Sequence, residues 1–193
     1  MDSKYKLIAD SFGNDSIKLD EPLKDRTALG IGGSAKVFFV ATSKPQIIKM
    51  VKTTKALKLP CLIFGTGSKL IVSDKGFDGV IIKNRTNNIA VLSVKGKVGK
   101  SGIEMDEAMV EVDSGVTLKN LIEFLDKQSL ESADIQDLPG SLGGNIFLNK
   151  VLQDKSEVIQ VLEDGEVEQI KKNALSLRKH IVLSVVFRFK AKR

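Results

Sequence analysis

A twelve-residue stretch, LPGSLGGNIFLN at residues 138–149, is too rich in glycine for a regular helix and too apolar for an ordinary solvent loop. Glycine permits positive φ angles and lets another group approach the backbone closely. The stretch therefore predicts either a tight turn or a backbone segment that lies against a ligand. Turn formation is the more common reason for a glycine cluster. Other features of the sequence are needed to distinguish a turn from a ligand-binding segment.

Two further glycine clusters precede this stretch. The sequence TALGIGGSA holds Gly32 and Gly33, and the sequence LIFGTGSKL holds Gly65 and Gly67 directly after a predicted strand. A strand that ends in Gly-X-Gly-Ser leaves backbone N–H groups that are unpaired and not shielded by side chains, and Ser68 adds a hydroxyl donor. Such a loop can hold a pyrophosphate.

The Gly65 cluster departs from the two common phosphate-binding motifs. Leu70 stands where the third glycine of G-x-G-x-x-G would be, and the apolar pattern of residues 70–82 indicates another strand rather than a long helix. The Gly-Lys-Ser/Thr ending of a Walker A loop is missing as well. A turn without a ligand therefore stays an alternative for each of the three clusters.

The spacing of apolar residues predicts an α+β protein of two lobes. In the first lobe, residues 1–83, strands and one helix are expected in the order strand, helix, strand, strand, at residues 35–41, 43–57, 59–64 and 79–83. Ser43 is the expected N-cap of the helix. This order favours a small parallel βαβ unit.

The second lobe, residues 84–193, is expected to be larger and mainly antiparallel. Two strand-like runs flank a link rich in Gly and Lys and predict a hairpin, and Thr117 is the expected cap of an amphipathic helix. A turn at Asp164-Gly165 predicts a second hairpin, which a final strand follows. The ranges of these elements are 89–94, 108–112, 117–128, 157–170 and 180–189.

A net charge of +6 and a pI near 9.3 indicate an anionic ligand or simply a basic surface. The Lys and Arg residues are scattered and aromatic residues are scarce, so nucleic acid is not an expected partner. One cysteine, Cys61, and one histidine, His180, exclude a disulfide and a Cys-rich or His-rich metal site. Cys61 lies in an apolar run and is expected to be buried. The lack of a signal peptide or a membrane-length apolar run favours a cytoplasmic protein without membrane contact.

Four blocks of the sequence occur in the order and spacing of one known family. They are PLKDRTALGIGGSAKVFFVATS, LPCLIFGTGSKLIVSDKGFDGVII, VDSGVTLKNLIEFL and LPGSLGGNIFLN. From about Pro22 onward the chain resembles the UDP-N-acetylenolpyruvoylglucosamine reductase (MurB) family, flavoproteins of peptidoglycan biosynthesis. The resemblance implies a PCMH-type FAD-binding fold of the vanillyl-alcohol-oxidase group, with FAD bound non-covalently between the two lobes.

The resemblance also implies which residues hold the flavin. The family's Gly-X-Gly-Ser-Asn loop, which holds the pyrophosphate, matches residues 65–69, with Lys69 in place of asparagine; this lysine would pair with phosphate or block the pocket. The family's Ile-Pro-Gly-Thr-Val-Gly-Gly segment matches residues 138–144, which would lie against the flavin and its phosphates. The implied FAD-binding residues are Gly32, Gly33, Gly65, Thr66, Gly67, Ser68, Lys69, Leu70, Gly115, Pro139, Gly140, Ser141, Gly143, Gly144 and Asn149.

The sequence departs from the family at three places. After Asn149 the family's small residues are replaced by Lys-Val-Leu-Gln at 150–153, which would crowd the backbone near the cofactor. The family's Tyr-Arg-X-Ser motif is matched only by Arg178, a candidate catalytic residue that is equally compatible with a solvated surface. The chain stops at Arg193, so the family's substrate domain, with its serine proton donor and its glutamate, is expected to be absent.

The leading hypothesis is therefore a MurB-like flavin module without the substrate domain. If it is an enzyme, it is a flavin-dependent oxidoreductase, with NADPH as a candidate electron donor and a protein partner that covers the exposed isoalloxazine. A first alternative is a scaffold that no longer binds flavin and acts as a nucleotide-binding or protein-interaction module. A second alternative is a UDP-N-acetylmuramate dehydrogenase that another chain completes.

Overall fold

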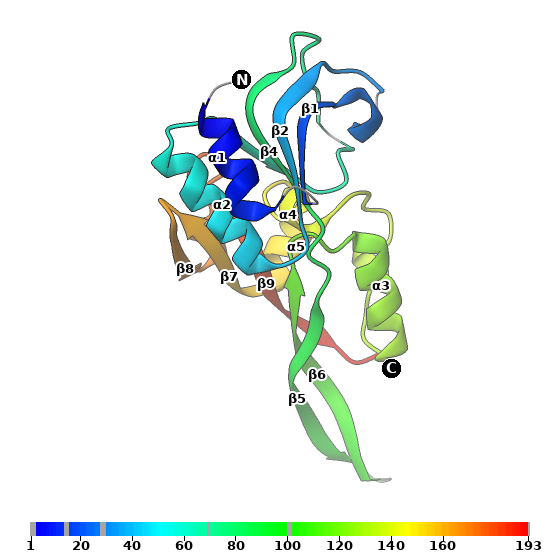
Figure 1. Ribbon diagram of the computed structural model, residues 1–193. Helices are drawn as coiled ribbons and strands as arrows, with labels where there is room; N and C mark the ends of the chain where they lie inside the picture. The colour runs from blue at the N-terminus through cyan, green and yellow to red at the C-terminus, as the bar shows by residue number, and fades with distance from the viewer. Residues whose placement is uncertain (1–2, 14–15, 28–29, 69, 100–101, 193) are drawn as a thin grey trace. The chain divides into compact units, whose positions relative to one another are not determined.

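The computed structural model describes residues 3–13, 16–27, 30–68, 70–99 and 102–192 of the 193-residue chain (Figure 1). The chain divides into two compact units, Met1–Thr86 and Asn87–Arg193, which we call unit 1 and unit 2. Each unit is built on its own β-sheet with a small number of helices. The predicted α+β class is confirmed.

Unit 1 contains a mixed four-stranded sheet in the order β1-β2-β4-β3. Both β2 and β3 pair in parallel with β4, and α2 connects β2 to β3, which confirms the predicted parallel βαβ unit. The antiparallel strand β1 and helix α1 have no counterpart among the sequence predictions. The bounds are α1 (Ser3–Phe12), β1 (Ile17–Pro22), β2 (Ser34–Ala41), α2 (Lys44–Ala56), β3 (Cys61–Phe64) and β4 (Phe77–Asn84).

The two faces of the unit 1 sheet are covered differently. Helices α1 and α2 lie over one face (Figure 1), where the Phe12 and Phe39 rings pack edge to face with centroids 5.3 Å apart. The other face holds a core cluster that includes Val72, from the irregular segment 65–76. The strand predicted over residues 70–82 is therefore wrong in its first half. It begins only at Phe77, because the chain turns at Gly76, whose φ is +81°.

Cys61 is exposed as a residue, contrary to the prediction that it is buried, while burial of its thiol raises the pKa of that group to about 11. The reason is the position of its strand, because β3 is a four-residue strand at the edge of the sheet. The apolar residues that follow Cys61 in β3 are only half-buried. An apolar run in the sequence therefore does not distinguish an edge strand from a central one.

Unit 2 contains an antiparallel five-stranded sheet in the order β5-β6-β9-β7-β8. Both predicted hairpins are present, and Asp164 and Gly165, with φ of 52° and 93°, form the predicted tight turn between β7 and β8. The strands are β5 (Ile89–Gly99), β6 (Gly102–Asp113), β7 (Ser156–Glu163), β8 (Glu166–Ile170) and β9 (Ile181–Lys190).

On both sides of residues 100–101, which lie outside the described residues, the link rich in Gly and Lys is strand rather than loop. β5 and β6 pair along the link as far as Gly99 and Gly102, with two bulges that accommodate irregular residues such as Gly96. Only the part of β6 from Glu107 onward pairs with β9, so the hairpin continues as a two-stranded arm (Figure 1). Cross-strand pairing along the arm therefore overrides the weak strand propensity of its glycines.

Helix α3 (Leu118–Lys127) packs on one face of the unit 2 sheet. The Oγ1 atom of Thr117 accepts a hydrogen bond from the N–H of Asn120 at 3.2 Å, which confirms the predicted N-cap. The buried stripe of the helix consists of Leu118, Leu121 and Leu125. These leucines belong to a core cluster with Val110, Val112, Val185 and Phe187.

The remaining helical segments are short. They are η1 (Lys24–Arg26), η2 (Ala133–Ile135), α4 (Leu142–Asn145), α5 (Lys150–Lys155) and η3 (Lys172–Ala174). Across the described ranges, no helix has the length and apolarity needed to traverse a bilayer.

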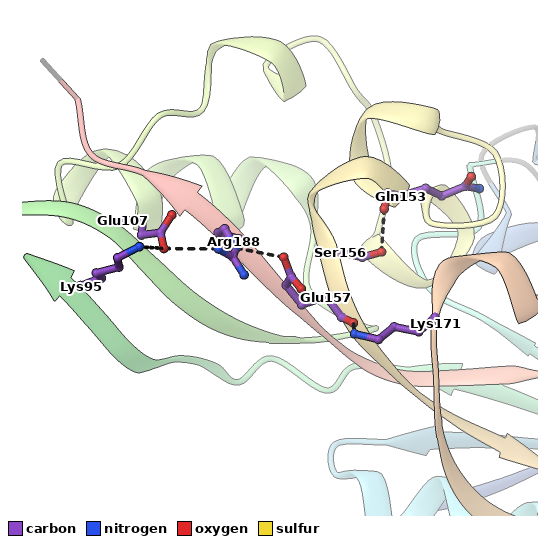
Figure 2. Close-up of polar contacts among 7 residues, drawn as sticks. All are labelled: Lys95, Glu107, Gln153, Ser156, Glu157, Lys171 and Arg188. Carbon is purple, nitrogen blue, oxygen red and sulfur yellow. Dashed lines mark hydrogen bonds and ion pairs between the residues drawn. The ribbon is translucent and has the colours of Figure 1, made fainter.

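The face of the unit 2 sheet opposite the core carries a row of charged side chains across its strands (Figure 2). Arg188 of β9 donates from Nε to Glu157 of β7 at 2.9 Å and from Nη1 to Glu107 of β6 at 3.3 Å. The amine of Lys95 on β5 lies 3.4 Å from the same Glu107 carboxylate. Surface pairs of this kind contribute about 0–1 kcal/mol each, so the row favours the strand register without forming a site.

The N-cap of α3 gives a direct test of this packing. Replacing Thr117 by Ala removes the acceptor for the Asn120 N–H and is expected to lower the free energy of unfolding by about 1 kcal/mol. Urea unfolding followed by circular dichroism measures this loss. Thr53→Ala is the control, because the Thr53 hydroxyl only bonds back to the Lys49 carbonyl within α2 at 2.9 Å. Equal losses in the two variants would contradict the assigned cap.

Candidate functional site

The loop of residues 65–68 follows the carboxyl end of β3. Gly67 has a φ of +77°, and a Cβ there would lie 2.7 Å from the carbonyl oxygen of Arg26, so the position requires glycine. The hydroxyl oxygens of Thr66 and Ser68 are exposed and lie 3.1 Å apart. Within the described residues, no oxygen accepts a hydrogen bond from the N–H groups of the four loop residues. Thr66 and Ser68 are exposed and present amides and a pair of mutually hydrogen-bonded hydroxyls, the donors that bind phosphate, while Gly67 itself is buried.

Of the next two predicted cofactor-binding residues, Lys69 and Leu70, the structure describes only Leu70. Lys69 lies outside the described residues. Leu70 is half-buried and packs against the core cluster of unit 1, and its N–H donates to the Gly67 carbonyl at 3.3 Å. Leu70 thus has a packing role that needs no ligand.

Gly32 and Gly33 also have a packing explanation. A Cβ at Gly32 would lie 2.9 Å from the Cβ of Val72, and a Cβ at Gly33 would lie 2.3 Å from the carbonyl oxygen of Asp74. The Gly33 N–H donates to the Ser73 carbonyl at 3.0 Å. Both glycines let two backbone segments of unit 1 approach each other closely.

Two basic side chains that no sequence motif indicated, those of Lys83 and Arg26, lie near the loop of residues 65–68. Lys83 of β4 is the register partner of Phe64 of β3, and its amine lies 4.8 Å from the Phe64 ring centroid. The Arg26 guanidinium lies 5.3 Å from the Phe38 ring centroid and 2.6 Å from the Glu21 carboxylate. Lys83 could have been identified from the sequence by its position. It directly follows the apolar run GVII, near the carboxyl end of a parallel strand, and open α/β sheets bind ligands at these ends.

In unit 2, the glycine stretch is tied to the segment that precedes α3. A Cβ at Gly143 would lie 3.1 Å from the Cβ and the carbonyl oxygen of Ser114, and Gly140 has a φ of +94°. Gly115 is half-buried in the same partner segment. Three backbone hydrogen bonds of 2.8–2.9 Å join the segments, from Leu118 to Gly140, from Leu142 to Val116 and from Gly143 to Ser114.

The same stretch leaves other groups open. Pro139 and Gly144 are exposed, and a Cβ at Gly144 would meet no atom within 4 Å. In the part of the chain that the structure describes, nothing accepts a hydrogen bond from the N–H groups of Gly140, Ser141 or Gly144. The residue Ser141 itself is buried, directly before α4. Gly144 therefore has no steric reason within unit 2 to be glycine, as expected of a position that faces a ligand.

Residues 149–153 form an ordered element rather than a crowded loop. The Oδ1 of Asn149 caps α5 by accepting hydrogen bonds from Val151 N at 3.0 Å and Leu152 N at 3.3 Å. Leu152 is fully buried in the core of unit 2. The Gln153 side-chain amide donates to the Ile146 carbonyl at 2.9 Å, and the Gln153 backbone carbonyl accepts a hydrogen bond from the Ser156 hydroxyl at 2.7 Å (Figure 2). The Asn149 side chain, predicted to bind the cofactor, is thus occupied by a helix cap.

Arg178 lies in an exposed turn of residues 177–179, after η3. Its neighbour His180 is buried and has a structural role. The His180 Nδ1 accepts a hydrogen bond from the Ser176 N–H at 3.1 Å, so Nε2 carries the proton and donates it to the Glu163 carboxylate at 3.0 Å. The histidine anchors the turn that exposes Arg178.

A comparison with models of protein families matches residues 35–152 to the FAD binding domain. This chain belongs to the FAD-binding domain family. The matched range contains both the loop of residues 65–68 and the stretch of residues 138–149. Both segments with open amides therefore lie in the part of the chain that the family shares.

The MurB resemblance is confirmed by relatives over the same region. The chain is 27% identical over 183 residues to the UDP-N-acetylenolpyruvoylglucosamine reductase of Syntrophomonas wolfei, in a match that covers 90% of this chain and 56% of the relative. The crystal structure of the MurB reductase from Thermus caldophilus matches with a TM-score of 0.58 at 21% identity, over 91% of this chain and 60% of that chain. This chain spans about half the length of the relatives it matches.

A second type of solved structure shares the fold. The 4-ethylphenol oxidase from Gulosibacter chungangensis matches with a TM-score of 0.64 at 16% identity, over 97% of this chain and 42% of that chain. At 16% identity, the similarity between this chain and the oxidase is a similarity of fold. The predicted PCMH-type FAD-binding fold is confirmed.

Two glycines of this FAD-binding domain should respond differently to the same substitution. Gly67→Ala forces a side chain into a left-handed backbone and against the Arg26 carbonyl, and is expected to cost about 1–2 kcal/mol of stability from the backbone alone. Gly144→Ala enters open space in α4 and is expected to leave stability unchanged or slightly higher. Urea unfolding of both variants measures the contrast. A destabilised Gly144→Ala protein would show that position 144 is constrained by packing.

Proposed function

We propose that this chain binds FAD non-covalently and serves as the flavin-holding module of a MurB-type oxidoreductase. The observation that carries the proposal is the loop of residues 65–68, whose four N–H groups lack an acceptor among the described residues. The loop follows a parallel strand in a chain that belongs to the FAD-binding domain family. Its amides and its two hydroxyls match the needs of a diphosphate.

The segment of residues 139–144 supplies the second group of contacts in this proposal. Its three open amides and the free space at Gly144 allow a planar ring system or a phosphate to lie against the main chain. Neither Cys61 nor His180 falls in a glycine cluster, which supports non-covalent attachment. Bound FAD would supply hydride transfer, and the residues named here would hold and orient it.

We infer that these 193 residues alone do not reduce UDP-N-acetylenolpyruvoylglucosamine, the substrate in the relatives' name. Arg178, the match to the family's reaction-centre arginine, lies in an exposed turn. The serine and the glutamate that the resemblance implies have no matching positions in this sequence. A substrate-holding part that continues this chain, or that a second chain supplies, would complete the cytoplasmic reaction, with NADPH as the donor.

A second candidate function is a MurB-type scaffold that binds no flavin and acts through protein or nucleotide contacts. One observation favours it. The family's small residues after asparagine are replaced here by α5, which uses Asn149 as its cap and buries Leu152. A flavin site that depended on Asn149 would compete with this cap.

The absorbance spectrum of the purified protein, followed by titration with FAD, tests these candidates. A flavin band, or saturable quenching of added FAD fluorescence, is the expected result. A colourless protein that takes up no FAD would favour the scaffold. Turnover of UDP-N-acetylenolpyruvoylglucosamine with NADPH by the 193 residues alone would overturn the inference that they are incomplete for the reduction.

Substitutions at Gly144 test the proposed contacts between FAD and unit 2 by binding affinity instead of absorbance. Gly144→Ala and Gly144→Leu should weaken FAD binding in that order, with at least about a tenfold loss for leucine, because each side chain fills space assigned to the ligand. Isothermal titration measures the affinity, and thermal melting of the apoprotein serves as the control. Unchanged affinity in both variants would remove position 144 from the site.

A further inference from the structure

Lys83 occupies a setting that is unusual for a lysine. It lies near the carboxyl end of β4, opposite Phe64 in the parallel register with β3, and it is half-buried. Its amine lies 4.8 Å from the Phe64 ring centroid, while the Arg26 guanidinium lies 5.3 Å from the Phe38 ring centroid. The two rings are neighbours, with centroids 6.4 Å apart. Two cations are therefore stacked on adjoining aromatic rings on the same part of unit 1.

The positive charge at this place is not balanced. Arg26 has one carboxylate partner, Glu21. For the stretches of chain that the structure describes, no carboxylate lies within ion-pair distance of Lys83 or Arg85. Burial, followed by the positive charges of Arg85 and Arg26, lowers the pKa of Lys83 below its ordinary value. A half-buried cation among like charges is destabilising unless an anion joins it.

The free amides of the loop at residues 65–68 lie next to this charge. Phe64, on which the Lys83 amine stacks, directly precedes the loop, and a Cβ at Gly67 would lie 3.3 Å from the edge of the Phe64 ring. The same Cβ would lie 2.7 Å from the Arg26 carbonyl oxygen. Neutral amide donors and an ammonium group without a carboxylate partner among the described residues thus border one place at the carboxyl ends of parallel strands.

We propose that Lys83 is the counter-charge of a diphosphate site in unit 1, in which its amine and the amides of residues 65–68 bind the same anionic group. The inference rests on the proposed function in taking the diphosphate of FAD as the ligand. Amides alone recognise the shape of a phosphate, whereas an ammonium group supplies the charge-assisted bond that gives affinity. Because Lys83 carries a long flexible stem, its amine can leave the Phe64 ring to reach the ligand without a change in the strand.

Lys83→Met tests the inference, because methionine keeps the apolar stem and removes the charge. FAD affinity, measured by fluorescence quenching, should fall about tenfold, as expected for the loss of one charge-assisted hydrogen bond. Its dependence on salt between about 50 and about 300 mM should become shallower. The melting temperature of the apoprotein should be equal or higher, because an unbalanced charge is gone. Lys83→Arg should retain most of the affinity.

Lys6→Met is the matched control, because Lys6 is an exposed residue of α1 in the same unit and the variant loses the same charge. Its FAD affinity should stay within about twofold of the wild type. Wild-type FAD affinity and an unchanged salt dependence in Lys83→Met would overturn the role of Lys83 and leave the proposed function intact.

Two further probes distinguish failure of this inference from failure of the proposed function. ADP carries a diphosphate without flavin, and riboflavin carries flavin without phosphate. ADP binding that weakens in Lys83→Met, with riboflavin binding unchanged, supports the diphosphate site. If the wild type binds ADP but not FAD, the proposed function fails while the Lys83 site stands. Binding of neither FAD nor ADP to the wild type would overturn both.

Discussion

The carbonyl oxygen of Arg26 occupies the space in which any side chain at position 67 would begin. The backbones of Arg26 and Gly67 therefore approach each other closely after β3. This contact holds the loop of residues 65–68 against η1, with Gly67 in a left-handed conformation that only glycine adopts without strain. In that conformation the loop amides find no acceptor among the described residues, and the exposed residues Thr66 and Ser68 present theirs to the surface.

In unit 2, backbone hydrogen bonds fix the glycine stretch in a similar way. Short backbone bonds tie residues 140–143 to residues 114–118, and Gly143 allows the close approach to Ser114. The next residue, Gly144, then lies at open space, and its N–H has no acceptor among the residues that the structure describes. The glycines of this stretch thus divide into two groups. Gly140 and Gly143 are explained by turn geometry and packing, and Gly144 is explained only by something that lies outside the unit.

Local patterns predict most of the fold, because its central features are local. The parallel βαβ unit, the Thr117 cap and the Asp164-Gly165 turn each depend on residues that are close in sequence. The failures are tertiary. β1 reads IKLDEP, with three charged residues and little apolar signal, and it is a strand because β2 offers it an edge. The β5–β6 arm extends through glycines because each strand pairs with the other.

The candidate site likewise has features that the sequence predicts and features that depend on tertiary contacts. The glycine segments were identifiable from sequence, since glycine is required wherever backbones approach closely. Which glycines serve packing was not, because Gly33 meets Asp74 and Gly67 meets Arg26 only after the chain has folded. Lys83 and Arg26 lie far apart in sequence and come together through the adjoining rings of Phe64 on β3 and Phe38 on β2, strands that β4 separates. Asn149 fits the family motif, but its own side chain caps the helix that replaces the family's small residues.

A residue that lowers the stability of its own element, and whose surroundings give no packing reason for it, is informative about function. Gly144 weakens α4 by about 0.5–1 kcal/mol relative to alanine, and nothing around it forbids a side chain. Lys83 holds a half-buried positive charge beside two others, and the described residues offer it no carboxylate. Both features lower the stability of the protein alone, and an anionic dinucleotide would compensate for both. Gly32, Gly33 and Leu70 do have a packing reason. Gly144 and Lys83, together with the loop amides of residues 65–68, therefore point to a flavin more strongly than the number of glycines does.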